Sequence, residues 1–159
     1  FPLRGGKGSM YEGGLRVPFV IIGPGVSKNS YSDVPVTGLD ILPTLARLAG
    51  YQGLLPNILD GGNIQTVIHN NGKGKVKRNS PYLIFHQAAN RKPISAIRFG
   101  DYKLVKDWRY NKLELFDLSR DLEEKVDLSK KMPDIVKKLD EALIKFLNEA
   151  DAETKQIKT

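Results

Sequence analysis

Apolar residues recur at helical spacing near the end of the sequence, starting just after Pro133. They lie three or four positions apart, and the positions between them carry mostly lysine, aspartate and glutamate. This spacing gathers the apolar side chains on one face, which is typical of a helix packed against a core. Proline is tolerated in the first turn, so Pro133 marks the expected start. The apolar face comprises Ile135, Val136, Leu139, Ala142, Leu143, Phe146 and Leu147.

Four short segments before this helix have the composition of β-strands. They are residues 82–86, 94–99, 102–106 and 113–118, and the last of them alternates apolar and charged positions. Only Gly100 and Asp101 separate the second segment from the third, which is the length of a tight hairpin turn. We therefore expect an antiparallel meander with the amphipathic helix docked on it.

The first 72 residues follow a different pattern. A glycine-rich loop at residues 1–14 leads into a continuous apolar run at 16–22, which predicts a strand buried on both faces. Residues 39–49 have helical spacing, with Ile41, Leu42, Leu45 and Leu48 on one face. Residues 53–80 are rich in Gly, Asn, Pro and Lys and predict a connection with at most one short helix.

These elements predict an α+β fold in two parts. Residues 1–72 are interpreted as edge pieces, one strand and one helix, that end a larger α/β domain. Residues 73–159 are interpreted as a small antiparallel four-stranded sheet with a C-terminal amphipathic helix. Because the strand and helix of the first part would expose apolar faces, we expect that part to be mobile or buried in a self-association contact.

Composition narrows the classes of site and partner. The 159 residues are 40% hydrophobic and 27% charged, as is ordinary for a globular domain. No apolar run approaches the ~20 residues of a membrane span, so no membrane partner is predicted. The absence of cysteine excludes disulfides, zinc–thiolate sites and a cysteine nucleophile. The sequence opens on Phe1 without a methionine or leader pattern, so we expect its true beginning to lie elsewhere.

Positive charge is concentrated in the middle of the chain. Residues 73–112 hold eleven basic and two acidic side chains, and the net charge of the whole chain is +7. Such a field attracts anions, for example sulfated or phosphorylated substrates or acidic polysaccharide. The alternative is a solvated surface that serves solubility, and both interpretations stay open.

The sequence Gly-Gly-Lys-Gly-Ser at residues 5–9 fits neither common phosphate-binding loop. A P-loop requires Ser or Thr directly after Gly-Lys, and Gly8 stands there. A dinucleotide fingerprint requires a third glycine at position 11, which is Tyr11.

A longer string does match a known pattern. Residues 2–18 read Pro-Leu-Arg-Gly-Gly-Lys-Gly-Ser-Met-Tyr-Glu-Gly-Gly-Leu-Arg-Val-Pro. This string resembles the second signature of the type I, formylglycine-dependent sulfatases, which belong to the alkaline-phosphatase-like superfamily. The similarity covers about the first 150 residues. It continues at residues 39–45, 59–61, 97–104, 114–118 and 121–124.

The resemblance assigns a catalytic and substrate-binding role to Lys7. In the family, the lysine of this signature binds the sulfate group of the substrate. An ammonium group suits that task, because negative charge builds on the bridging oxygen as the S–O bond breaks. Arg4 and Arg16 belong to the same string, and we favour a structural role for them, in pairing with Glu12 or with loop carbonyls, over a role in the anion site.

Other parts of the family site are absent from this sequence. No Cys or Ser begins a Cys/Ser-x-Pro-x-Arg motif, which carries the formylglycine precursor in the family, and neither segment of the calcium site occurs. We therefore predict no metal or cofactor bound by this chain and no activity of the chain alone. The resemblance implies calcium and formylglycine in a full-length enzyme.

The sequence contains two histidines. His69 lies in a polar connection and is interpreted as a surface residue. His86 ends a predicted strand beside the basic segment, and some family members present a residue of this region to the leaving group of the substrate. His86 is therefore a candidate substrate-binding residue, with an ordinary strand-end histidine as the alternative.

The sequence is compatible with several functions and partners. The resemblance favours sulfate ester hydrolysis, with a sulfated small molecule or carbohydrate as substrate and an N-terminal sulfatase domain as partner. A phosphonate or phosphoester hydrolase of the same superfamily is the first alternative, and a basic module for acidic polysaccharide is the second. Nucleic acid is disfavoured, because few aromatic residues remain outside the predicted core to stack on bases. The family suggests a periplasmic, secreted or lysosomal protein, which the sequence itself leaves undetermined.

Overall fold

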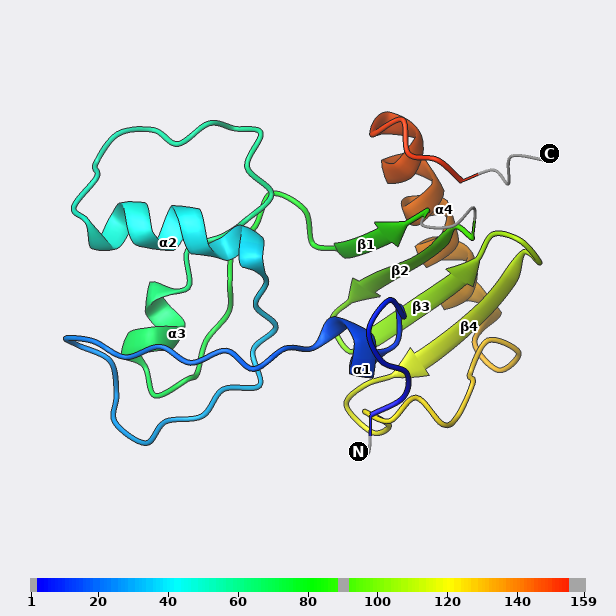
Figure 1. Ribbon diagram of the computed structural model, residues 1–159, viewed down its shortest axis with the longest axis horizontal. Coiled ribbons are helices and arrows are strands. Elements are labelled where there is room, and N and C mark those ends of the chain that lie inside the picture. The colour runs from blue at the N-terminus through cyan, green and yellow to red at the C-terminus, as the bar shows by residue number, and fades with distance from the viewer. Residues whose placement is uncertain (1–2, 89–91, 155–159) are drawn as a thin grey trace. The chain divides into compact units, whose positions relative to one another are not determined.

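The computed structural model describes residues 3–88 and 92–154. The chain divides into two compact units, one formed by Phe1–Val17 together with Tyr82–Thr159 and the other by Pro18–Pro81. Figure 1 shows the elements of each unit along the chain. Within the described residues, no helix is long and apolar enough to cross a membrane.

The first unit is built on the predicted four-stranded antiparallel sheet. Its strands are β1 (Leu83–Gln87), β2 (Ile94–Phe99), β3 (Tyr102–Asp107) and β4 (Lys112–Asp117), and they lie in the order β1-β2-β3-β4. Every neighbouring pair is antiparallel, with Ile97 opposite Leu104 and Leu104 opposite Leu115. The predicted meander is therefore confirmed, with strand ends shifted by one residue at most.

Helix α4 (Pro133–Glu149) covers one face of this sheet, as its apolar spacing predicts. Leu139, Leu143 and Leu147 are buried against strand residues of the same core. Burying each such side chain contributes roughly 1.5–3 kcal/mol, so this face alone accounts for much of the attachment of α4. The strand residues of this core are Ile97, Leu104 and Leu115.

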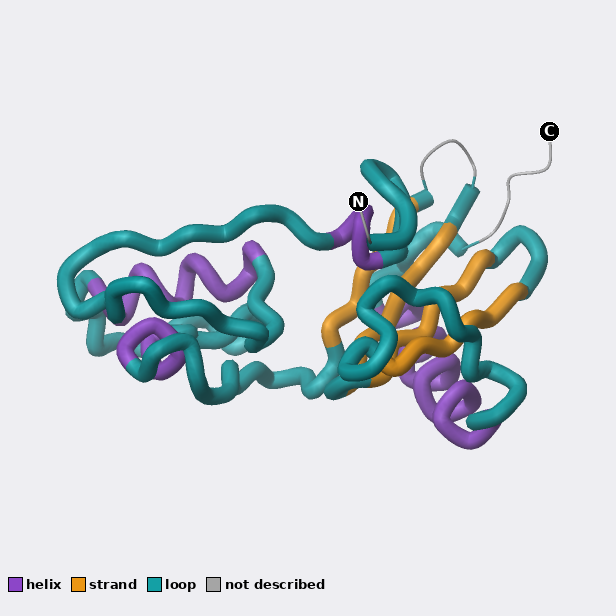
Figure 2. Tube along the Cα trace, turned by 90° about the horizontal axis from the view of Figure 1, so that it is seen from below, coloured by secondary structure: helices purple, strands orange, loops and turns teal. Residues whose placement is uncertain are grey.

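The glycine-rich segment covers the opposite face of the sheet. It contains the one-turn helix α1 (Glu12–Leu15), and Met10 packs there with the alternate strand residues Ala96, Val105 and Phe116. Figure 2 shows α1 and α4 on opposite sides of the strands. The two covered faces explain why successive residues in the middle of β2, β3 and β4 are buried, although their side chains alternate between the faces.

The second unit contains η1 (Gly38–Asp40), α2 (Ile41–Leu48) and α3 (Gln65–His69). Asp40 is fully buried and organises this unit. Its carboxylate accepts hydrogen bonds from the backbone of Thr37 and Gly62 and forms a 2.6 Å ion pair with Arg78. Burial raises the pKa of Asp40, but these donors outweigh it, so the pKa lies below its ordinary value.

The predicted strand at residues 16–22 is wrong for this structure. Arg16 ends α1, and the residues after it are extended without a ladder partner. Val17, Val20 and Ile22 are 77%, 78% and 90% exposed. A strand requires a neighbour, and in the part of the chain that the structure describes β1 to β4 pair only with one another. The apolar composition of residues 16–22 indicates a segment that is stabilised by burial, but it does not identify the segment that would cover it.

The α+β class is confirmed by the sheet and helix of the first unit. The boundary predicted after residue 72 is the end of a large α/β domain in a longer protein, and it stays a prediction. Within this structure, Phe1–Val17 group with the sheet and the second unit ends at Pro81.

Candidate functional site

Lys7 lies at the tip of a tight turn on the face of the sheet opposite α4. The amide of Ser9 donates a 3.0 Å hydrogen bond to the carbonyl of Gly6, which leaves Lys7 and Gly8 at the centre of the turn. Gly8 has φ +84°, a left-handed conformation that a glycine adopts without cost. The side chain of Lys7 is exposed, and no ion pair found among the described residues involves it.

The turn is fastened to the protein on both sides. On one side, a Cβ atom at Gly14 would lie 2.2 Å from the carbonyl oxygen of Ser9, so only glycine allows α1 to pack this closely on the turn. On the other side, Nε2 of Gln87, the last residue of β1, donates a 2.5 Å hydrogen bond to the carbonyl of Gly8. Sequence reasoning missed Gln87, because its contact joins residues 79 positions apart.

A buried group of charges lies behind the turn and centres on Lys103 of β3. The ammonium nitrogen of Lys103 lies 2.8 Å from a carboxylate oxygen of Glu12 and 2.8 Å from a carboxylate oxygen of Glu124. The other oxygen of Glu12 accepts a 2.7 Å bond from Arg16, and the other oxygen of Glu124 accepts a 2.6 Å bond from the backbone N–H of Glu12. The predicted pairing of Arg16 with Glu12 is therefore confirmed.

The two carboxylates of this group have opposite pKa shifts. Burial raises the pKa of Glu12, but the nearby Lys103 and Arg16 outweigh that effect and bring the pKa below its ordinary range. Burial also raises the pKa of Glu124, and there Lys103 and the amide of Glu12 offset it only in part, so the pKa lies above its ordinary range. Glu12 is thus the firmly ionised partner of Lys103.

Arg4, at the start of the loop, is committed to internal contacts. Its guanidinium donates to Glu114 at 3.2 Å, to the Tyr11 hydroxyl at 3.1 Å and to the backbone carbonyl of Glu124 at 3.1 Å. The Tyr11 hydroxyl donates to Glu114, and burial together with that carboxylate raises the pKa of Tyr11. Of the two contacts predicted for Arg4, the bond to a loop carbonyl is confirmed at Glu124, and the carboxylate partner is Glu114 instead of Glu12.

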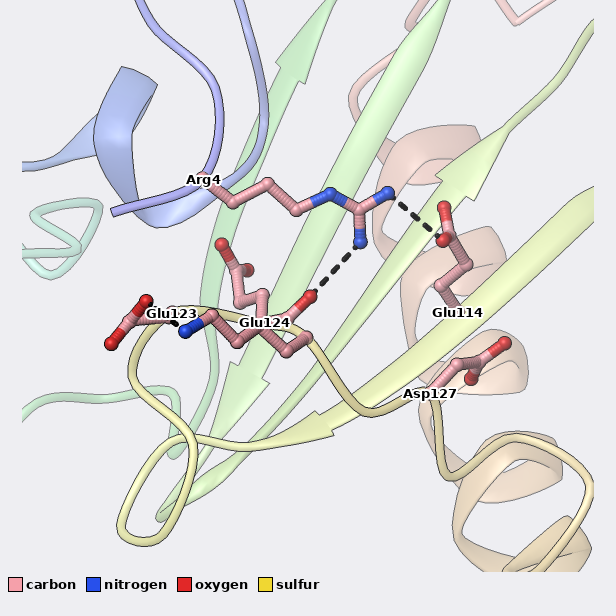
Figure 3. Close-up of a pocket in the computed structure, with 6 residues that line it drawn as sticks. Arg4, Glu114, Glu123, Glu124 and Asp127 are labelled. Carbon is pink, nitrogen blue, oxygen red and sulfur yellow. Dashed lines mark hydrogen bonds and ion pairs between the residues drawn. The ribbon is translucent and has the colours of Figure 1, made fainter. Parts of the chain in front are cut away.

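The surface pocket beside Arg4 is acidic. Figure 3 shows its lining, with the Arg4 guanidinium directed toward the Glu114 carboxylate and the Glu124 backbone. Four carboxylate side chains against two cations make this pocket unsuited to a sulfate group. Its lining residues are Arg4, Glu114, Glu123, Glu124, Lys125 and Asp127.

The side chain of His86 lies on the other face of the sheet, the face that carries α4. One ring nitrogen is 2.8 Å from the Ser95 hydroxyl and the other is 3.1 Å from the backbone carbonyl of Glu153. The indole of Trp108 donates to the same hydroxyl at 2.8 Å. The structure therefore does not bring His86 together with Lys7, and its role in substrate binding stays a prediction. His69, at the end of α3, is exposed and bonds the carbonyl of Gly25 at 2.8 Å.

Several basic side chains of residues 73–112 form ion pairs within the protein. Arg78, Lys103, Lys106 and Arg109 each form an ion pair with a carboxylate of this chain. No group of three or more His, Asp or Glu side chains within residues 3–88 and 92–154 is arranged to hold a metal ion. Lys73, Lys75 and Lys77 of this segment are exposed, as Lys7 is, so the structure leaves several cations open to an external anion.

Comparison with known proteins points to the sulfatases. Residues 6–149 match the family model described as "N-sulphoglucosamine sulphohydrolase, C-terminal". Arylsulfatase K of Mus musculus is 30% identical over 149 residues, which cover 89% of this chain and 27% of that protein. Arylsulfatase A of Homo sapiens is 38% identical over 102 residues, which cover 64% of this chain and 19% of that protein.

Solved structures agree with the sequence relatives. The crystal structure of Ps i-CgsB is 32% identical with a TM-score of 0.76, and the match covers 92% of this chain and 32% of that one. A protein solved with its substrate D-glucosamine-2-N,6-O-disulfate shares the fold at 20% identity and a TM-score of 0.61, over 84% of this chain and 28% of that one. The chain thus spans between about a fifth and a third of the length of these proteins.

The buried charges predict a pH-dependent stability. We expect Glu12→Gln to lower the free energy of unfolding by about 3 kcal/mol near neutral pH, because it leaves Lys103 short of a partner. The pKa of Glu12 is lowered from the ordinary 4.5 by folding, so its contribution is present above that value and is lost as pH falls through the folded pKa. Urea titrations at about pH 7 and about pH 3.5 measure the difference.

The matched control for this measurement is Glu123→Gln, which removes a surface carboxylate paired with Lys125 at 2.6 Å. Its effect is expected to stay below about 1 kcal/mol at both pH values. A loss for Glu12→Gln that is equal at both pH values would contradict the assignment of Glu12 as the ionised partner.

Proposed function

We propose a function for this chain on one premise: the chain belongs to the N-sulphoglucosamine sulphohydrolase C-terminal family and so corresponds to the C-terminal region of sulfatases. In this proposal it is part of a sulfuric ester hydrolase. It supplies the sulfate-binding lysine and a C-terminal subdomain. The observation that carries the proposal is the exposed ammonium of Lys7 on a turn held by Gln87 and Gly14.

The chemistry of sulfate ester cleavage suits such a lysine. Negative charge grows on the bridging oxygen as the S–O bond breaks, and a fixed ammonium close to that oxygen stabilises the transition state more than the bound substrate. The turn has little freedom to rearrange, because its backbone is bonded at Gly6 and Gly8. The backbone that carries Lys7 is therefore held before substrate arrives, which supports a preorganised role for its side chain.

Two further groups belong to the proposed whole enzyme. In sulfatases formylglycine supplies the nucleophile, and calcium supplies positive charge beside it. The residues of this chain fit neither group, since no Cys or Ser of the sequence begins the precursor motif and the described acids form no metal cluster. We assign both groups to the part of the enzyme outside this chain, with residues 1–72 ending its large α/β domain and residues 73–159 forming the subdomain.

A sulfated carbohydrate is the substrate class that we favour. Among the structural relatives, one was solved with its substrate D-glucosamine-2-N,6-O-disulfate, and Ps i-CgsB was solved with k-i-k-neocarrahexaose. A separate basic module for acidic polysaccharide has less support, because five cations of the basic segment are paired with carboxylates of this chain.

We expect the isolated 159-residue chain to show no sulfatase turnover. It lacks a nucleophile and metal ligands, so Lys7 alone cannot cleave the ester. The assay uses a chromogenic aryl sulfate with added calcium. Turnover that survives repurification and is lost in Lys7→Ala would show that the chain carries a complete site.

In a full-length enzyme that contains this chain, we expect Lys7→Ala to lower kcat/KM by about 10²–10³, as for the loss of one electrostatic stabiliser. The matched control is Lys28→Ala, which removes an exposed lysine of the other unit and should leave kcat/KM unchanged. Folding of both variants is checked by circular dichroism. Unchanged kinetics in a folded Lys7→Ala variant would show that Lys7 is a solvated loop residue with no role in catalysis.

The second unit exposes apolar side chains that would be suited to contact another protein surface. Leu42, Leu45 and Leu48 of α2 are 57%, 58% and 47% exposed, and Val20 and Ile22 of the same unit are 78% and 90% exposed. Leaving several such side chains in water is unfavourable. We propose that they contact the remainder of a sulfatase in the whole enzyme, and a second copy of this chain when it is isolated.

Self-association of the isolated chain is expected to depend on α2. Leu45→Lys should lower the mass measured by light scattering at high concentration, whereas Leu122→Lys, at a partly exposed leucine of the sheet unit, should not. Amide exchange should be slow at residues 135–147 and fast at 16–22 in dilute solution. A strictly monomeric chain with equal protection of both segments would contradict the proposal.

A further inference from the structure

Glu124 touches both ends of the loop that carries Lys7. Its backbone carbonyl accepts the guanidinium of Arg4 at 3.1 Å, and its carboxylate accepts the N–H of Glu12 at 2.6 Å. Lys7 lies between these two residues in the sequence. The amide of Gly13 also donates to the carbonyl of Arg4 at 2.8 Å, so the two ends of the loop lie side by side.

The position of Glu124 is unfavourable for an ordinary residue. Its backbone has φ +55°, in the left-handed region where a side chain with a Cβ atom is strained. Its carboxylate is fully buried, and burial raises its pKa. Strained backbone and buried charge persist where the surroundings fix them, and such sites cluster where geometry matters for function.

Stability alone is a weak explanation for these buried charges. Removing an ammonium and two carboxylates from water has a desolvation free energy that cancels much of their mutual attraction. Apolar residues of similar size often stabilise a core to the same extent. Ion pairs and hydrogen bonds, however, are directional and fix a partner in one orientation, whereas apolar contacts are not directional. The contacts of Lys103 and Glu124 converge on Glu12 and thereby fix α1 and the loop before it.

Strand β3 contains an internal comparison. Lys106 is also buried, and its ammonium pairs with Asp140 of α4 at 2.7 Å. Lys103 and Lys106 are three residues apart and therefore lie on opposite faces of the sheet. One ion pair attaches the long helix, and the other attaches the loop of Lys7.

We propose that Glu124 and Lys103 are positioning residues that close the segment from Arg4 to Glu12 and hold Lys7 in its sulfate-binding position. This inference rests on the proposed function of Lys7. Neither residue touches the turn itself, so both act through Glu12 and Arg4.

Amide exchange on the 159-residue chain tests the closure of the loop without any activity. Lys103→Met is expected to speed exchange of residues 4–16 by about tenfold more than exchange of β2 to β4, because local opening then costs less than global unfolding. Lys106→Met, the matched control, should speed exchange in α4 and leave the ratio of loop to strand exchange unchanged. Glu124→Ala should reproduce Lys103→Met, and Glu124→Gln, which keeps an acceptor for the Glu12 amide, should restore part of the protection.

The inference would be overturned if the ratio of loop exchange to strand exchange were the same in all four variants. It would also be overturned if Lys106→Met speeded exchange of the loop as much as Lys103→Met does. If Lys103→Met does not fold, Glu124→Gln and Glu124→Ala give the comparison.

A double-mutant cycle in the full-length enzyme tests the link to Lys7. Lys103→Met is expected to lower kcat/KM by at least about tenfold with Lys7 present and by less than about twofold in a Lys7→Ala background, because residues that act through one another are not additive. Equal losses in both backgrounds would overturn the positioning role. An enzyme without sulfatase activity would refute the proposed function, while the exchange ratios would still decide whether the loop is held by this network.

Discussion

The ammonium group of Lys103 must have negative partners, because it is buried in the sheet away from water. Its two carboxylates come from Glu12 before the sheet and Glu124 after it, 112 positions apart in sequence. That requirement brings the glycine-rich loop onto one face of β3, and Ala96, Val105 and Phe116 then supply apolar surface under the loop. The exposed position of Lys7 follows from these buried contacts.

The strands, α4 and the candidate lysine could be predicted because each depends on local sequence. The 3.6-residue period of α4 and the two-residue turn at Gly100 specify their elements whatever the rest of the chain does. Lys7 was recognised from a contiguous string of residues. The same string indicated which residues surround it, and the structure places Arg16 against Glu12 as expected.

The remainder depends on long-range contacts that a single sequence does not specify. Nothing in the local pattern around Glu124 or Gln87 indicates that each reaches the loop of Lys7. Likewise, the apolar run at 16–22 has the composition of a strand, but pairing is a property of two segments. His86 and Gln87 are neighbours in β1, so their side chains lie on opposite faces of the sheet, and it is Gln87 that reaches the turn of Lys7.

The spacing of Lys103 and Lys106 also limits how the length of the chain can vary. One residue inserted between them would turn both ammonium groups to the same face, and one of them would lie among apolar side chains far from its carboxylate. The exposed connection at residues 53–60 carries no such constraint, so extra residues there cost only the small entropy of a longer loop. Insertions and deletions among related chains therefore belong in the connections, and the length of β3 is fixed by two charges.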